Sequence, residues 1–414
     1  MMQDWAGWLL LLFNFSIVLM WKHVRSDIKV VHTIWFCIFL HYVVALLNAY
    51  VGTIIGAGGD AAVFHLAGVK LAALPELMWF SGIGSGSVTY ANFLGLFYQF
   101  FGASLILGEG LSVLAFTLSC IVLVRLVSLL DLGRFRVGII LLFGLLPSAV
   151  IFRSVTLRES WQALFFLLSV YWAVRLWKRP RILIFSFMLM SVYCMAIQHN
   201  GLKWYAVGFI LTSIYWGTSG SKGNVRLTRI AHLMFAGLLV ACVATLALKM
   251  GWLKTLGQGL KEAEAFRQEA ATIHGRATYG VVLDTSSVYG LVKTIPVIFA
   301  QYMFAPFPWQ IGNVKDVWAL LESMLRFLLL YFAVYSWHGS SGKVRSYYSF
   351  LLIFFLGMEL IWALGTINWG TATRHHVPGY SVIVLLGTPG LILFMRRLHF
   401  GIFGCRKDNT MLPK

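Results

Sequence analysis

One carboxylate, Asp60, has the most suggestive setting for chemistry in this sequence. It follows Gly58 and Gly59 and precedes Ala61, in a segment that begins where an apolar run ends. Glycine places no side chain in the way, so a substrate can approach the backbone closely. A carboxylate there can act as a general base that removes a proton from a hydroxyl group. The alternative is a structural role, because Asp60 precedes the helix-forming residues 61–74 and would cap that helix.

Arginines in the other polar segments are suited to bind a phosphate group, because a guanidinium forms paired hydrogen bonds with phosphate oxygens. Arg158 precedes Glu159, which would orient an arginine, and Arg374 precedes two histidines shortly before the last apolar run. The alternative is a set of interfacial side chains that extend toward the lipid headgroups. The candidates for binding phosphate are Arg153, Arg158, Arg276 and Arg374, together with His375.

Two further segments carry side chains that can contact a substrate. His199, Asn200 and Lys203 lie in a polar turn between two apolar runs and offer an imidazole, an amide and an ammonium group to one site. The same residues also suit an ordinary turn between helices. Trp309 lies in the sequence PFPW at 306–309, where two prolines stiffen an aromatic surface. That surface would either stack on a sugar or anchor the chain at the headgroups.

The composition places these residues in a membrane protein. Of the 414 residues, 59% are hydrophobic and only 12% are charged, and the mean hydropathy is +0.79. A soluble globular protein has about 25% charged residues. The composition therefore excludes a water-soluble enzyme, a disordered chain and a nucleic-acid-binding module.

The sequence predicts about eleven membrane spans, since a spanning helix needs roughly 20 mostly apolar residues. The apolar runs have the approximate limits 5–21, 30–50, 103–125, 135–152, 161–177, 182–198, 203–217, 230–250, 317–337, 347–365 and 379–396.

The connections between these runs are of two alternating kinds. One kind is short and basic, as in residues 22–29, 134–136 and 175–181, and the other kind is longer and contains the candidate residues. Basic connections of membrane proteins face the cytoplasm, so the N-terminus is predicted outside and the C-terminus inside. This orientation requires an odd number of spans. It also accounts for most of the net charge of +18.

We therefore predict an all-α fold, a polytopic transmembrane helix bundle with one membrane domain over residues 1–414. The outer loops 52–102 and 251–316 would form its active-site face. Within the first loop, residues 92–101 are apolar but too short to span, which predicts a re-entrant or interfacial helix. The five cysteines form no CxxC motif and no cluster with histidines, so neither a disulfide framework nor a structural zinc site is indicated.

The order of these features resembles the GT-C superfamily of polytopic glycosyltransferases and the related membrane polymerases of bacterial polysaccharide assembly. Members of that superfamily use sugars linked to a polyprenyl phosphate. The resemblance consists of short matches scattered over most of the chain. They are GGDA at 58–61, PS at 147–148, LRES at 157–160, PFPW at 306–309, NWG at 368–370 and RHH at 374–376.

The resemblance implies that Asp60 is the catalytic base in the first large outer loop, and that basic residues of other outer loops hold the donor phosphate. The family usually places this aspartate after the first span, whereas here it follows the second apolar run. The loop contains no Asp-x-Asp or Asp-Glu pair. We therefore predict a reaction that needs neither a metal ion nor another cofactor.

The expected function is transfer of a sugar or glycan from a polyprenyl-phosphate or pyrophosphate carrier to a glycan or lipid acceptor. The reaction would take place on the outer face of a membrane, the bacterial inner membrane, and would involve membrane lipids but no nucleic acid. One alternative is a polymerase or ligase without a carboxylate base, which would rely on Arg276, Arg374 and the histidines. Another is a flippase or transporter for lipid-linked oligosaccharides. Glycosyl transfer requires that Asp60 and several arginines converge at the outer rim of the bundle.

Overall fold

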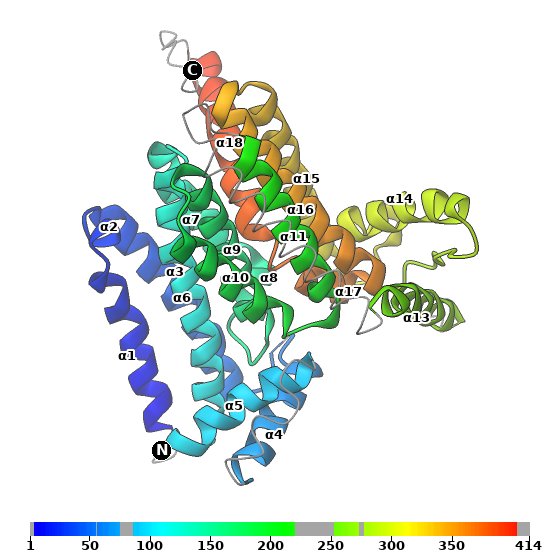
Figure 1. Ribbon diagram of the computed structural model, residues 1–414. Helices are drawn as coiled ribbons and strands as arrows, with labels where there is room; N and C mark the ends of the chain where they lie inside the picture. Colours follow the sequence, from blue (N-terminus) through cyan, green and yellow to red (C-terminus); the bar gives the residue numbers. More distant parts are fainter. Residues whose placement is uncertain (1–3, 55, 75–85, 220–251, 273–276, 404–414) are drawn as a thin grey trace.

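Most of the apolar runs fold into α-helices that pack along one another in the computed structural model (Figure 1). The structure describes residues 4–54, 56–74, 86–219, 252–272 and 277–403. These residues contain no β-strand, and one isolated bridge joins Thr278 to Asn368. The predicted all-α fold is therefore confirmed for the described part of the chain.

Among the described residues, five helices are long and apolar enough to cross a membrane. They are α3 (Ile28–Tyr50), α6 (Leu105–Leu129), α15 (Val314–His338), α16 (Gly342–Gly365) and α18 (Tyr380–Phe403). Shorter apolar helices in the same part of the chain are α1 (Trp5–Met20), α10 (Ile182–Ala196) and α14 (Val288–Phe304). This is the character of an integral membrane protein. The larger number of spans stays a prediction, and its run 230–250 lies outside the described residues.

The apolar run 135–152 forms two short helices instead of one span. They are α7 (Arg136–Leu145) and α8 (Pro147–Phe152), preceded by the short helix η2 (Gly133–Phe135). Pro147 is the cause, because proline has no N–H and holds the preceding residue in an extended conformation. Leu146 accordingly has φ −54° and ψ 123°, and the helix restarts with Pro147 as its first residue.

The helices of the predicted outer segments are mostly shorter. In the first loop, α4 (Asp60–Ala72) packs against α5 (Ser87–Phe101), which includes the short helix predicted at 92–101. The later segments contain α13 (Trp252–Thr272), η3 (Pro308–Gln310) and α17 (Trp369–His375). The remaining helices are α2 (Lys22–Arg25), α9 (Glu159–Lys178) and α11 (Asn200–Ser219).

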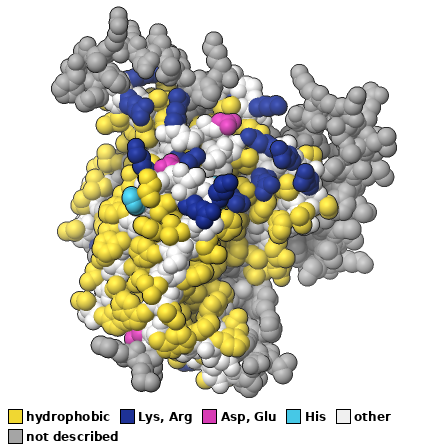
Figure 2. All heavy atoms as spheres, turned by 90° about the vertical axis from the view of Figure 1, so that its left-hand side faces the viewer, with side chains coloured by type: hydrophobic (Ala, Val, Ile, Leu, Met, Phe, Trp, Pro, Cys, Tyr) yellow, Lys and Arg dark blue, Asp and Glu magenta, His cyan; other side chains and the backbone are white. Residues whose placement is uncertain are grey.

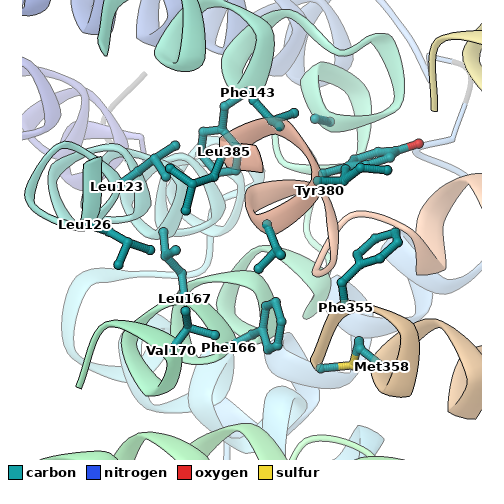
Figure 3. Close-up of a cluster of buried hydrophobic side chains, with 14 of the residues drawn as sticks. Leu123, Leu126, Phe143, Phe166, Leu167, Val170, Phe355, Met358, Tyr380 and Leu385 are labelled. Carbon is teal, nitrogen blue, oxygen red and sulfur yellow. The ribbon is translucent and has the colours of Figure 1, made fainter. Parts of the chain in front are cut away.

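The apolar core lies where α6, α7, α9, α16 and α18 meet (Figure 3). Leu123 of α6, Phe143 of α7 and Leu167 of α9 are fully buried there. Phe355 of α16 and Leu385 of α18 complete the cluster. Lipid tails are as apolar as these side chains, so burial from lipid gives little driving force, and close packing holds such helices together.

Two glycines bring α18 directly against the backbone of α15. A side-chain carbon at Gly387 would collide with the carbonyl group of Leu329, and one at Gly390 would lie 2.9 Å from the carbonyl oxygen of Phe332. Small residues allow membrane helices to approach closely and to gain van der Waals contact along their backbones. The two glycines therefore allow α15 and α18 to pack with their backbones in direct contact.

Basic side chains gather at one end of the bundle. Figure 2 shows Lys and Arg in a band above a broad hydrophobic face, at the height of α2 in Figure 1. There Arg136 lies 3.5 Å from Asp27, and Arg125 Nε donates a hydrogen bond to His23 Nδ1 at 3.2 Å. The predicted basic connections 22–29 and 134–136 therefore meet in space. The helices α4 and α5 lie at the other end, beside the start of α1 (Figure 1).

Candidate functional site

Asp60 is the first residue of α4, and its carboxylate faces an arginine from a distant part of the chain. Gly59 precedes the helix with φ +61°, a conformation that favours glycine, and Gly59 is the N-cap residue. The alternative that the Asp60 side chain caps this helix is therefore wrong. Instead, Asp60 Oδ2 accepts a hydrogen bond from Arg374 Nη1 at 2.6 Å, and 54% of the Asp60 side chain is exposed.

Arg374 lies in the last turn of α17 and contacts two carboxylates at once. Besides Asp60, it forms an ion pair with Glu159, in which Nε lies 3.0 Å from Glu159 Oε1. Glu159 is the first residue of α9, and its side chain is only 1% exposed, whereas that of Arg374 is 17% exposed. One guanidinium thus connects α17 to α4 on its exposed side and to α9 on its buried side.

Arg158 lies beside this pair. Its Nη1 donates to the carbonyl oxygen of Gln198 at 3.0 Å, and its guanidinium lies 5.7 Å from the ring of Phe64. Burial lowers the pKa of Arg158, and the neighbouring carboxylate of Glu159 opposes that shift. Arg158 Nε is buried without a hydrogen-bond partner among the described residues, which leaves a donor for a ligand.

Two neutral histidines contact Trp362 next to the arginines. The ring of His199 lies 4.5 Å from that of Trp362, and the ring of His375 lies 4.2 Å from it. Burial, together with the positive charges of Arg158 and Arg374, lowers the pKa of His199 to about 3. The pKa of His375 is also far below its usual range, for the same reasons.

Hydrogen bonds determine which nitrogen of each ring carries the proton. His199 Nδ1 accepts from the backbone N–H of Gly201 at 3.1 Å, so its proton is on Nε2. Thr366 Oγ1 donates to the carbonyl of Trp362 and lies 2.7 Å from His375 Nδ1. A hydroxyl has one proton to donate, so His375 Nδ1 is the donor to Thr366 and its Nε2 carries a lone pair.

Several contacts hold α17, and thereby Arg374, in place. Asn368 caps the helix, because its Oδ1 accepts a hydrogen bond of 2.7 Å from the backbone N–H of Thr371. Trp369 Nε1 donates a hydrogen bond of 2.9 Å to Asp316 Oδ1. The backbone N–H of Tyr279 donates to the carbonyl of Ile367 at 2.9 Å, beside the bridge described above. The end of the long outer segment therefore lies next to the start of α17.

Arg267 attaches α13 to the same region. Its guanidinium donates to the carbonyls of Ala363, Leu364 and Thr366 at the end of α16, at 2.5, 3.1 and 2.6 Å. A fourth hydrogen bond, of 3.1 Å, goes to Val281. A positive side chain at a helix C-terminus satisfies carbonyls that lack partners within the helix and interacts favourably with the helix dipole. The sequence does not indicate this role of Arg267, because the charged helix formers of residues 261–271 are typical of a solvated surface helix.

The structure does not bring every predicted residue to this cluster. Arg153 is fully buried, donates to the carbonyl of Val377 at 3.0 Å and lies 4.2 Å from the ring of Phe143. Trp309 is 79% exposed and stacks on Phe307, with 5.1 Å between the ring centroids. Asn200 is exposed and Lys203 half-buried in the first turn of α11. Arg276 lies outside the described residues.

A second polar cluster is buried between the long helices. Glu322 accepts from Ser148 and, at 2.5 Å, from Tyr380, which in turn accepts from Arg326. Glu359 lies 2.5 Å from Nδ1 of the buried His376. Glu322 and Glu359 therefore face the interior of the bundle and pair with polar neighbours. Among the described residues, no three acidic, histidine or cysteine side chains are grouped in a way that would hold a metal ion.

Fold and site together define a helical protein with membrane-spanning character and a cluster of two acids, two arginines and two histidines at one end. No protein-family model and no curated protein match the chain. The proposals below therefore rest on the residues and their geometry.

Proposed function

We propose that the chain is a membrane glycosyltransferase or polymerase that takes a sugar or glycan from a polyprenyl-phosphate or pyrophosphate carrier. The observation that carries this proposal is the contact of Asp60 with Arg374, with Arg158 beside them, at the end of the bundle away from the basic connections. A carrier of this kind presents an anionic phosphate at the membrane surface and an isoprenoid tail in the lipid. Two arginines at the membrane surface suit the anionic phosphate of this headgroup, and the nearby acid suits a proton acceptor for the attacking hydroxyl group.

Each residue of the cluster has a task in this reaction. The oxygen of an acceptor hydroxyl attacks the anomeric carbon, its proton passes to the carboxylate of Asp60, and the bond from carbon to phosphate oxygen breaks. The electron pair leaves with the phosphate, whose charge Arg158 and Arg374 neutralise. His199 and His375 are neutral, so they can bind sugar hydroxyls without adding charge.

The position of the basic connections predicts on which side of the membrane the reaction takes place. Basic connections face the cytoplasm, so the cluster, at the other end, would face the exterior or periplasm of a bacterial-type cell. Trp309 and Lys203 are the remaining candidates for contacts with the glycan, and Arg276 for contact with the phosphate. The acceptor is a hydroxyl group of a glycan or lipid.

The test is release of polyprenyl phosphate by the purified protein in lipid nanodiscs, supplied with a panel of polyprenyl-phosphate sugars and oligosaccharide acceptors. This product can be followed by ³¹P NMR whichever acceptor is used. Asp60→Asn should abolish release, because an amide cannot take up the proton. The matched control is Asp284→Asn, which removes the same charge from an exposed side chain before α14. Full turnover by Asp60→Asn would remove Asp60 from the mechanism.

A flippase for lipid-linked oligosaccharides is the second candidate. The observation that favours it is the buried cluster of Glu322, Arg326 and Glu359 within α15 and α16, since charges inside membrane helices commonly mark transport pathways. Vesicles that carry a labelled donor in the inner leaflet distinguish the two functions. Movement of the label to the outer leaflet without a new glycosidic bond would favour the flippase.

A further inference from the structure

We infer that the substrate phosphate replaces Asp60 as a partner of Arg374, while Glu159 keeps Arg374 in place during the exchange. The inference rests on the proposed function for the identity of the substrate, and it concerns the regulation of that same site. Asp60 is held by Arg374 in the free protein, and it becomes available as a base when an anionic headgroup binds.

The two carboxylates hold Arg374 in different ways. Asp60 contacts the terminal nitrogen Nη1 and has a 54% exposed side chain, whereas Glu159 contacts the inner nitrogen Nε and is 1% exposed. An exposed acid that loses its partner is solvated at once, so exchanging it costs little. A buried acid that loses its partner is left as an uncompensated charge, which is expensive. Asp60 is therefore the partner that leaves.

The charges of the cluster require such an exchange. Asp60, Glu159, Arg158 and Arg374 contribute two negative and two positive charges, so these four side chains carry no net charge while Asp60 stays in contact with Arg374. When Asp60 moves away, Nη1 of Arg374 and the unpartnered Nε of Arg158 become donors to one anion. Both are guanidinium nitrogens, which suit phosphate oxygens. Asp60 lies directly after Gly58 and Gly59, where the backbone can turn without steric conflict.

Glu159 is a positioning residue in this scheme. With Glu159 in place, the guanidinium is held by the ion pair at Nε, which does not have hydrogen-bond geometry, and it keeps its position when its outer partner changes. Without Glu159, Arg374 would have to be ordered by the phosphate itself, at a cost of about twofold to tenfold in affinity for a long side chain.

The experiment measures binding of anions to the full-length protein in nanodiscs by isothermal titration calorimetry, without any transfer reaction. The probes are inorganic pyrophosphate, as a free phosphate, and farnesyl phosphate, as an isoprenoid headgroup. Asp60→Asn should bind both about fivefold more tightly than the wild type, because an exposed ion pair of about 1 kcal/mol no longer competes. A larger gain for farnesyl phosphate would identify a lipid headgroup as the natural ligand, and an equal gain a free phosphate.

The second variant separates exchange from simple electrostatics. Glu159→Ala also removes one negative charge next to Arg374, so charge alone would tighten binding. Our inference gives the opposite sign: Glu159→Ala should weaken binding about threefold. Glu159→Gln should weaken it to a similar extent, because the contact with Arg374 Nε is an ion pair without the geometry of a hydrogen bond, and an amide carries no charge. The matched control Asp284→Asn should leave the affinity within error of the wild type.

Thermal unfolding of every variant establishes that the folded protein is being compared. Tighter binding by both Asp60→Asn and Glu159→Ala, or unchanged binding by Asp60→Asn, would overturn the inference. Because affinity is measured without turnover, these results are independent of the transfer assay. If the wild-type protein shows no transfer, the proposed function is refuted. The titrations would still decide whether phosphate replaces Asp60 as a partner of Arg374.

Discussion

Replacing Arg267 by alanine should detach the outer helix α13 from the membrane bundle without unfolding the long helices. Arg267 is 2% exposed and forms four hydrogen bonds to carbonyl oxygens, three at the end of α16 and one at Val281. Burial lowers its pKa to about 10, so the guanidinium is charged at neutral pH.

The size of the effect follows from the number of bonds. A net contribution of about 1 kcal/mol for each hydrogen bond gives about 4 kcal/mol for the four, and the loss leaves carbonyls of α16 without partners. The lysine variant keeps the charge but has a single nitrogen, which can satisfy one or two of the carbonyls. Arg267→Lys should therefore lose about half of this energy. Lys261→Ala, on the exposed side of the same helix, should change the free energy by less than about 0.5 kcal/mol.

Hydrogen–deuterium exchange in nanodiscs is the assay, because it measures opening of one segment separately from global unfolding. Amides of residues 252–272 and 277–283 should exchange faster in Arg267→Ala, and those of α6 should not change. Equal exchange in the wild type, Arg267→Ala and Arg267→Lys would refute the view that one buried arginine secures α13.

Three other changes test further parts of the structure. Gly387→Val should destabilise the protein by at least about 2 kcal/mol in thermal or denaturant unfolding, because its side chain would meet the carbonyl of Leu329, whereas Gly208→Ala, with nothing within 4 Å, should be neutral or slightly stabilising. Since the pKa of His199 is about 3 in the folded protein, the unfolded chain binds its proton first as the pH falls. Stability should therefore decrease below about pH 6.5, by at most about 1.4 kcal/mol per pH unit from this histidine, and His199→Gln should flatten that slope. Trp309→Ala should leave the melting temperature unchanged because the side chain is 79% exposed, and an increased KM for the glycan donor in the transfer assay would identify a substrate contact, whereas an unchanged KM would exclude one.

The sequence indicated most members of the cluster but not their pairing. Asp60, Arg158, His199 and Arg374 were singled out because each is polar or charged at the end of an apolar run, and membrane proteins keep such residues out of the lipid unless they have a task. Their meeting depends on helix packing across hundreds of residues. The partner of Glu159 is Arg374, more than two hundred positions away, and no local pattern specifies that contact.

Arg153 shows where residue type alone is insufficient. It lies five residues before Arg158 and offers the same guanidinium, yet it is buried against Phe143 while Arg158 lies in the cluster. The turn between α8 and α9 determines this difference. The break at Pro147 was readable from the sequence, since proline disfavours a continuous helix, but the high hydropathy of 135–152 concealed it. The apolar helix α14 was likewise hidden by Lys293 and Pro296 within it.

The glycine contacts of α18 limit which parts of the molecule can move relative to one another. Because the backbone of α18 contacts carbonyl groups of α15, the two helices cannot rotate or slide past each other without a steric clash. We therefore expect α15 and α18 to move as one rigid unit. In the proposed reaction, any movement that makes room for a long glycan would therefore have to involve α4 and α5, which the contact of Asp60 with Arg374 joins to α17. Loss of the Asp60–Arg374 contact would free α4 and α5 from α17 without changing the contact between α15 and α18.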